Sequence, residues 1–220
     1  MTSPAFRLIV FDLDGTLVDS RRDLAESVNT LLSERGLHVL PEESVGRMVG
    51  DGAAVLVSRA FAAAGAIAEP EALDRFLTIY HARLLKYARA YDGIREVLSA
   101  LAPRIPLAVL TNKPLAATLA VLDGLDLAQY FPADRVLGGD GPLPRKPDPA
   151  GLEWLASQCD VPVSATLLVG DSLVDARTAR AAAARLCLAR YGFGFQELSD
   201  ARIGPDEYVI ERPLDLLGIV

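Results

Sequence analysis

The sequence predicts an α/β protein with a Rossmann-like parallel sheet as its core and a small α-helical domain inserted after the first strand. From residue 92 onward, short apolar segments alternate with segments of helical periodicity. This pattern is typical of a parallel sheet covered by helices on both faces. Residues 18–89 contain helical patterns and no convincing strand. We therefore expect an α/β core over 1–17 and 90–220 and a helical domain over 18–89.

The first strand is expected at Leu8-Ile9-Val10. This segment is short and apolar, Ile9 and Val10 are β-branched, and Gly15 follows soon after. Such a pattern is typical of a buried strand that runs into a turn.

The inserted domain is expected to contain helices only. Ser20 and Asp23 resemble a capping box at the start of its first helix, and Gly36 is expected to end that helix. The later helical segments are expected to begin at Pro41 and to cover 53–64 and about 70–89.

The core pattern predicts five further strands, at 107–110, 135–137, 166–169, 186–188 and near 208–210. Helices are expected between them, over 93–101, 114–122, 149–159 and 174–184. Parallel sheets of this kind bind ligands at the carboxyl ends of their strands. The residues that follow each strand are therefore the first candidates for a functional site.

Composition narrows the class of protein. The chain has 220 residues and a formal net charge of −7, which argues against a nucleic-acid partner because such proteins normally carry a basic surface. Cys159 and Cys187 lie in apolar segments without a metal or redox spacing, so we expect both to be reduced core residues. The sequence shows no targeting signal and no membrane span, and we expect a cytoplasmic protein without membrane contact.

Polar side chains follow three of the expected strands. They are Asp12 and Asp14 after the first strand, Thr111 and Asn112 after the strand at 107, and Asp171 after the strand at 166. Two carboxylates one residue apart raise each other's pKa unless a cation lies between them or one of them keeps its proton. A bound Mg²⁺ or a shared acid–base role would explain the pair Asp12 and Asp14.

Four motifs occur in the order found in the haloacid dehalogenase superfamily, which the chain resembles over its whole length. They are Asp-x-Asp-Gly-Thr-Leu at 12–17, Thr-Asn at 111–112, Lys-Pro-x-Pro at 146–149, and Gly-Asp-Ser at 170–172 with Asp175 shortly after. The segments 91–93, 111–114, 138–140 and 191–194 resemble in particular the phosphoglycolate phosphatase-like subfamily with a helical cap. The resemblance implies a HAD-like fold and a phosphatase.

The residue types fit that chemistry. Asp12 is the candidate nucleophile, because a carboxylate can attack phosphorus and form an aspartyl-phosphate. Asp14 is the candidate general acid and base. Mg²⁺ prefers oxygen ligands, and the resemblance also implies a metal site made by Asp12, the backbone carbonyl of Asp14 and Asp171, with Asp175 as support.

The remaining candidates bind the phosphoryl group or the rest of the substrate. Lys146 is expected to neutralise Asp12 and the phosphoryl oxygens. Phosphate binding is also expected from Gly15, Thr111 and Asn112. In the inserted domain, which by this resemblance is the cap, Arg47 in the glycine-rich loop 46–52 is the expected substrate-reading residue, and Lys113 is expected to share its pocket.

Several alternatives remain open. Taken singly, the carboxylates and Thr111-Asn112 could be turn or helix-capping residues and Lys146 an exposed loop lysine. The expected function is Mg²⁺-dependent hydrolysis of a small phosphomonoester, such as a phosphoglycolate-like compound, a sugar phosphate or a nucleotide, by a monomer or homodimer. The alternatives are a phosphomutase of the β-phosphoglucomutase type and a non-catalytic regulator that binds a phosphorylated metabolite.

Overall fold

A six-stranded parallel sheet forms the centre of the computed structural model, which describes residues 6–195 and 203–220. In spatial order the strands are β5 (Val136–Leu137), β4 (Leu107–Leu110), β1 (Leu8–Phe11), β6 (Thr166–Gly170), β7 (Arg185–Ala189) and β8 (Tyr208–Ile210). All of these pairings are parallel. The sheet confirms the predicted α/β class.

β1 is buried on both faces because it lies in the middle of the sheet. Ile9 and Phe11 belong to one hydrophobic cluster, and Leu8 and Val10 belong to a second cluster on the opposite face. Successive side chains of a strand point to opposite faces, so only an unbroken apolar run satisfies both clusters. This explains why the strand could be located from composition alone.

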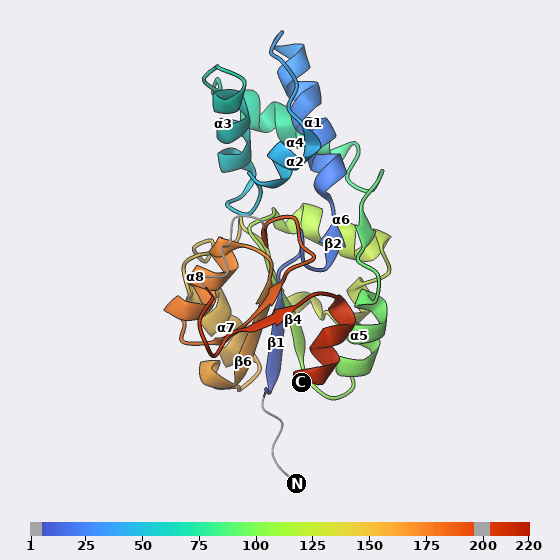
Figure 1. The fold of residues 1–220 in the computed structure, drawn as a ribbon, viewed down its shortest axis with the longest axis vertical. Helices are drawn as coiled ribbons and strands as arrows, with labels where there is room; N and C mark the ends of the chain where they lie inside the picture. The colour runs from blue at the N-terminus through green and yellow to red at the C-terminus, as the bar shows by residue number, and fades with distance from the viewer. Residues whose placement is uncertain (1–5, 196–202) are drawn as a thin grey trace.

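Four helices cover the two faces of the sheet (Figure 1). They are α5 (Ile94–Leu101) and α6 (Leu115–Gly124) on the face of Ile9, and α7 (Ala150–Gln158) and α8 (Leu173–Ala181) on the face of Leu8. Short 3₁₀ segments cover Ala128–Tyr130, Ala133–Arg135, Val163–Ala165 and Pro213–Gly218. Among the described residues, no helix is both long and apolar enough to cross a bilayer.

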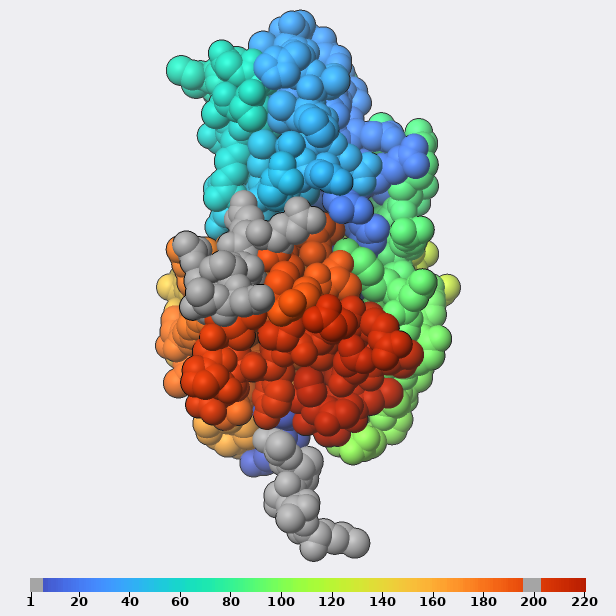
Figure 2. All heavy atoms as spheres, viewed as in Figure 1, coloured from blue at the N-terminus to red at the C-terminus, as the bar shows by residue number. Residues whose placement is uncertain are grey.

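The remaining helices form a second lobe, here called the helical lobe (residues 20–88). It contains α1 (Arg21–Glu34), α2 (Glu42–Gly46), α3 (Ala53–Ala63) and α4 (Ala72–His81). Figure 2 shows this lobe above the larger α/β part. Between the two parts the chain leaves and returns through an antiparallel pair, β2 (Val18–Asp19) and β3 (Arg89–Ala90).

The prediction that residues 18–89 contain no strand is therefore wrong at both ends of that range. β2 and β3 have two residues each, and a pair this short is stabilised by tertiary context rather than by a local sequence pattern. Its position explains why the helical lobe can be inserted without disturbing the central sheet.

Two local predictions in the helical lobe are also wrong, because the residues concerned make contacts with other parts of the chain. Ser20 makes no capping bond to α1 and instead donates to Asp14 Oδ1 at 2.6 Å. Asp23 is fully buried, and its Oδ2 accepts the amide protons of Tyr87 and Ala88 at 2.9 and 2.8 Å. Because these amides are satisfied by Asp23, the returning chain needs no helix there, and α4 ends at His81 rather than near residue 89.

Asp23→Ala is expected to destabilise the protein, because two amide groups held by one carboxylate would lose their acceptor. The expected loss in the free energy of unfolding is about 1–3 kcal/mol, measured by urea denaturation. Asp123→Ala, at an exposed position of α6, is the control and should change stability by less than about 0.5 kcal/mol. Equal stability of the two variants would contradict this role for Asp23.

Candidate active site

The carboxyl ends of three adjacent strands bring the candidate residues together. β1 lies between β4 and β6, so the loops that follow these strands meet at one edge of the sheet. They carry Asp12 and Asp14, Thr111 and Asn112, and Asp171. Because the ends of adjacent parallel strands lie side by side, residues about 100 to 160 positions apart in the sequence become neighbours in space.

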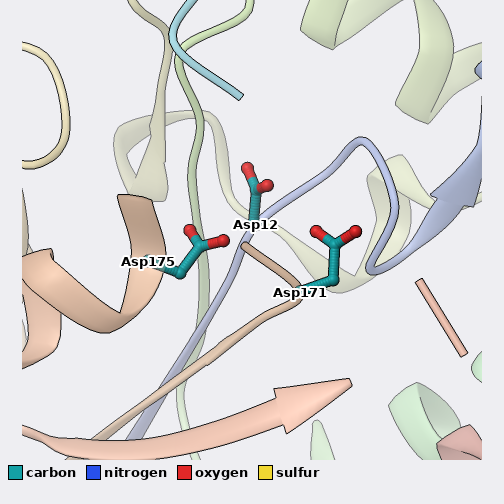
Figure 3. Close-up of side chains that lie close together, drawn as sticks. All are labelled: Asp12, Asp171 and Asp175. Atoms are coloured by element: carbon teal, nitrogen blue, oxygen red, sulfur yellow. The ribbon is translucent and has the colours of Figure 1, made fainter. Parts of the chain in front are cut away.

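Three buried carboxylates form what we call the acid cluster, made of Asp12, Asp171 and Asp175. One oxygen of each lies within 4.8 Å of one oxygen of the others. Figure 3 shows these side chains converging from the end of β1, the loop after β6 and the first turn of α8. Burial raises the pKa of Asp12 to about 6, although Lys146 opposes the shift. Burial and the carboxylates of Asp175 and Asp12 raise the pKa of Asp171 well above its usual range.

Lys146 is the basic side chain that contacts this cluster. Its Nζ lies 2.9 Å from Asp12 Oδ1 and 2.6 Å from Asp175 Oδ1, and its side chain is buried. Burial lowers the pKa of Lys146, but the two carboxylates outweigh this effect and hold it above its usual value. The prolines around Lys146 therefore do not expose it, and the lysine reaches inward.

Asp14 points to different partners from Asp12. Lys113 Nζ lies 3.0 and 3.1 Å from its two carboxylate oxygens, and Ser20 Oγ donates to Oδ1 at 2.6 Å. Lys113 is itself buried, and the Tyr80 hydroxyl on α4 accepts a hydrogen bond from its Nζ. The sequence treated Asp12 and Asp14 as a repelling pair, whereas each of them has its own lysine in the structure.

The net negative charge of the site favours the binding of a divalent cation. When ionised, the acid cluster and Asp14 carry four negative charges, against two positive charges on Lys113 and Lys146. The excess of two negative charges equals the charge of Mg²⁺, whose preferred ligands are carboxylate oxygens. Asp12 Oδ1 is buried and has no hydrogen bond of normal geometry, although Lys146 lies close to it. The acid cluster therefore fits Mg²⁺.

Asp171 is held in place by one backbone amide and one side-chain hydroxyl. The amide of Gly194 donates to Asp171 Oδ2 at 2.8 Å, and Thr16 Oγ1 donates to Oδ1 at 3.3 Å. Gly15 has a φ of +89°, and a Cβ at this position would lie 2.0 Å from Asp171 Oδ2. Gly15 thus permits both the turn after Asp14 and the close approach of Asp171.

Asn112 joins the core loops to the helical lobe. Its Nδ2 donates to the carbonyl of Gly50 at 2.9 Å and to the carbonyl of Lys146 at 2.8 Å. Thr111 Oγ1 accepts the amide proton of Lys113 at 3.3 Å. The start of α6 is held instead by Asp140, which accepts the amide proton of Leu115 at 2.7 Å. The capping alternative for Thr111 and Asn112 therefore does not describe their contacts.

A cavity of about 270 Å³ lies between the helical lobe and the strand ends. The core contributes Asp12, Asp14, Thr111, Asn112 and Lys113 to its lining, and the lobe contributes residues of α1, α3, α4 and the loop before α3. The cavity therefore opens directly onto the carboxylates.

Arg47 is not brought to this cavity. It is exposed, and its guanidinium donates to Ser44 Oγ at 3.2 Å. Gly50 and Gly52 of the same loop do line the cavity, while Asp51 pairs with Arg59 at 2.7 Å. The loop predicted to read the substrate thus reaches the site through its backbone, with the Arg47 side chain turned away.

A family model described as haloacid dehalogenase-like hydrolase matches residues 6–183. The chain belongs to the haloacid dehalogenase-like hydrolase family. This assignment confirms the resemblance seen in the four motifs, and it places the acid cluster, Lys146 and Thr111 inside the matched range.

Several similar proteins carry the name phosphoglycolate phosphatase. A phosphoglycolate phosphatase of Rhodospirillum rubrum is 43% identical over 196 residues, which cover 85% of this chain and 80% of that protein. One of Caulobacter vibrioides is 38% identical over 213 residues, covering 94% and 88%. A crystal structure described as a predicted phosphoglycolate phosphatase from Haemophilus somnus is 32% identical, with a TM-score of 0.89 over 98% of both chains. These findings confirm the predicted fold and the prediction of a hydrolase that resembles phosphoglycolate phosphatases.

Sequence reasoning missed three groups that support the site. Tyr80 falls in the helical segment predicted over about 70–89, and helical spacing does not reveal that its hydroxyl meets Lys113. Ser20 was read as a helix cap although its partner is Asp14. The segment 191–194 was used only for family resemblance, yet the amide of Gly194 holds Asp171. The recurrence of glycine in that segment was the available signal for close backbone approach.

Gly15→Ala is expected to weaken Mg²⁺ binding roughly 10- to 100-fold, because the new Cβ would displace Asp171. Isothermal titration calorimetry with MgCl₂ measures the effect. Gly36→Ala is the matched control, since Gly36 also has a positive φ of +67° but has open space where the Cβ would lie. Both variants carry the backbone strain of about 1–3 kcal/mol, so equal Mg²⁺ affinities would contradict the role of Gly15.

Tyr80→Phe is expected to lower kcat/KM for a simple aryl phosphate about fivefold, because Lys113 loses a hydrogen bond of about 1 kcal/mol. Steady-state release of p-nitrophenol measures this change. Tyr130→Phe is the control, since the hydroxyl of the half-buried Tyr130 bonds to Ser99 at 2.7 Å and does not line the cavity. A Tyr80 variant as active as the Tyr130 variant would remove Tyr80 from the site.

Proposed function

We propose that the protein is a Mg²⁺-dependent phosphatase that hydrolyses a small phosphomonoester through an aspartyl-phosphate on Asp12. The observation that carries this proposal is the separation of two neighbouring carboxylates into different environments. Asp12 lies in the acid cluster beside Lys146, and Asp14 lies on the cavity beside Lys113 and Ser20. A nucleophile and a proton carrier require such a difference.

In the first step, a carboxylate oxygen of Asp12 attacks phosphorus while the bond from phosphorus to the leaving oxygen breaks. The leaving oxygen takes a proton from Asp14, which must enter this step protonated. In the second step, Asp14 takes a proton from a water molecule, the water oxygen attacks phosphorus, and the bond to Asp12 breaks. Asp14 ends the cycle protonated and Asp12 ends it free.

Positive charge near phosphorus comes from Lys146 and the metal. Bound Mg²⁺ would supply charge that stabilises the transferring phosphoryl group. The residues that would hold it are Asp12, the backbone carbonyl of Asp14 and Asp171, with Asp175 in support. Lys146 remains beside Asp12 throughout, because Asp175 anchors it from the other side. Thr111 and Asn112 line the cavity together with Asp12, and they and Gly15 would bind the phosphoryl oxygens.

Residues 18–89 would act as the cap of this active site. The Asn112 contact to Gly50 and the Lys113 contact to Tyr80 tie the helical lobe to the catalytic loops. A lobe held in this way excludes water from the cavity during phosphoryl transfer. The substrate must then enter and leave by breaking these few polar contacts.

Asp12→Asn is expected to lower kcat at least about 1000-fold, because an amide cannot form the aspartyl-phosphate. Phosphate release from a broad panel of phosphomonoesters, measured with and without Mg²⁺, tests both the activity and its metal requirement. Chelation by EDTA should abolish wild-type activity, and added Mg²⁺ should restore it.

Asp126→Asn provides the matched control. It makes the same chemical change at an exposed turn residue with a positive φ of 54°, where asparagine is well tolerated. This variant should retain wild-type kcat. A wild-type protein that releases no phosphate from any ester in the presence of Mg²⁺, or an Asp12→Asn variant that keeps the activity, would overturn the proposal.

A further inference from the structure

The cavity between the helical lobe and the strand ends is larger than a two-carbon leaving group requires. Its volume of about 270 Å³ lies near the lower limit for small-molecule sites. The phosphoryl group occupies the end beside Asp12 under the proposed function, and the helical lobe supplies much of the remaining lining.

Hydrocarbon side chains form most of the wall on that side. Leu24, Leu56, Phe76 and Leu77 line it from three helices of the lobe, and Ala53 and Ala117 line it from α3 and α6. Leu24, Leu56 and Phe76 are almost completely buried. A polar or charged group placed among them would lose its hydration without gaining a partner.

Among the described residues, the lining offers an acidic leaving group no lysine or arginine that is free of a carboxylate partner, and its one histidine, His81, lies at an exposed position. Of the described residues that line the cavity, Lys113 is the sole lysine or arginine, and both oxygens of Asp14 already contact it. A substrate carboxylate beside Lys113 would therefore also lie close to Asp14. Arg47, the residue expected from the sequence to meet such a carboxylate, is exposed and outside the lining.

We infer that the leaving group is an uncharged alcohol with an alkyl or aromatic portion, rather than a small hydroxy acid such as glycolate. The inference rests on the proposed phosphatase function and names the substrate class of the same site. The phosphate end binds at the carboxylates, and the apolar portion packs against Leu56 and Phe76. Each methylene that enters the wall region should raise kcat/KM about three- to fourfold until the cavity is full.

A series of alkyl phosphates tests the inference, because ethyl, butyl and hexyl alcohols are closely similar leaving groups and differ mainly in length. We expect kcat/KM with Mg²⁺ to rise at least tenfold from ethyl to hexyl phosphate. Isobutyl phosphate, whose leaving group is an uncharged near-isostere of glycolate, should be a better substrate than 2-phosphoglycolate. A flat or falling series, or a preference for 2-phosphoglycolate over isobutyl and hexyl phosphate, would overturn the inference and leave the phosphatase function intact.

Matched variants connect the preference to the cavity wall. Ala53→Leu should fill part of the cavity and lower the hexyl-to-ethyl ratio of kcat/KM at least fivefold, whereas Ala54→Leu, at the exposed neighbouring position of α3, should leave this ratio unchanged. Ala117→Leu makes the same test from the core side if the first variant folds poorly. An unchanged ratio in folded Ala53→Leu and Ala117→Leu would contradict the inference. Failure of every ester, p-nitrophenyl phosphate included, would instead overturn the phosphatase function, and the inference with it.

Discussion

The contact of one buried ammonium group with two buried carboxylates is the constraint on which the site depends. Lys146 Nζ lies between Asp12 and Asp175 at 2.9 and 2.6 Å. An unpaired charge at this depth would be strongly destabilising, so the loops that follow β1, precede α7 and begin α8 must meet. Asp175 also accepts the Ser172 amide and hydroxyl protons at the start of α8. Its helix-capping role and its contact with Lys146 therefore coexist, each using a different carboxylate oxygen.

A second lysine gives the neighbouring carboxylate a different environment. Lys113 contacts both oxygens of Asp14 and also the Tyr80 hydroxyl, and burial raises the pKa of Tyr80 to about 12, so this phenol stays protonated. Asp12 and Asp14 are two residues apart in the chain, but the turn at Gly15 and the two lysines separate their surroundings. Asp12 and Asp14 can therefore have different chemical roles because distant loops supply each of them with a different lysine.

Elements whose structure follows from the local pattern of residues could be predicted from the sequence. Elements whose structure depends on contacts with distant residues could not. The strands at 107–110 and 208–210 were located fully, because strands of a buried parallel sheet must be apolar throughout. β2 and β3 were missed because two-residue strands exist only through their pairing with each other. Arg47 was assigned to the substrate on its charge and its loop, but the exit of the chain from α2 turns it to solvent. Such orientations are not encoded in residue type or spacing.

The loop after β4 couples the helical lobe to the catalytic edge through consecutive residues. Asn112 binds the carbonyls of Gly50 and Lys146 at once, and Lys113 binds Tyr80 and Asp14 at once. Movement of the lobe away from the core would remove Gly50 from Asn112 and Tyr80 from Lys113. It would also expose the cavity to more water and thereby weaken the pairing of Lys113 with Asp14, because ion pairs are weaker at higher dielectric. The environment of Asp14 therefore depends on the position of the lobe, and a leaving group that packs against the apolar wall would favour the arrangement in which the lobe contacts the core.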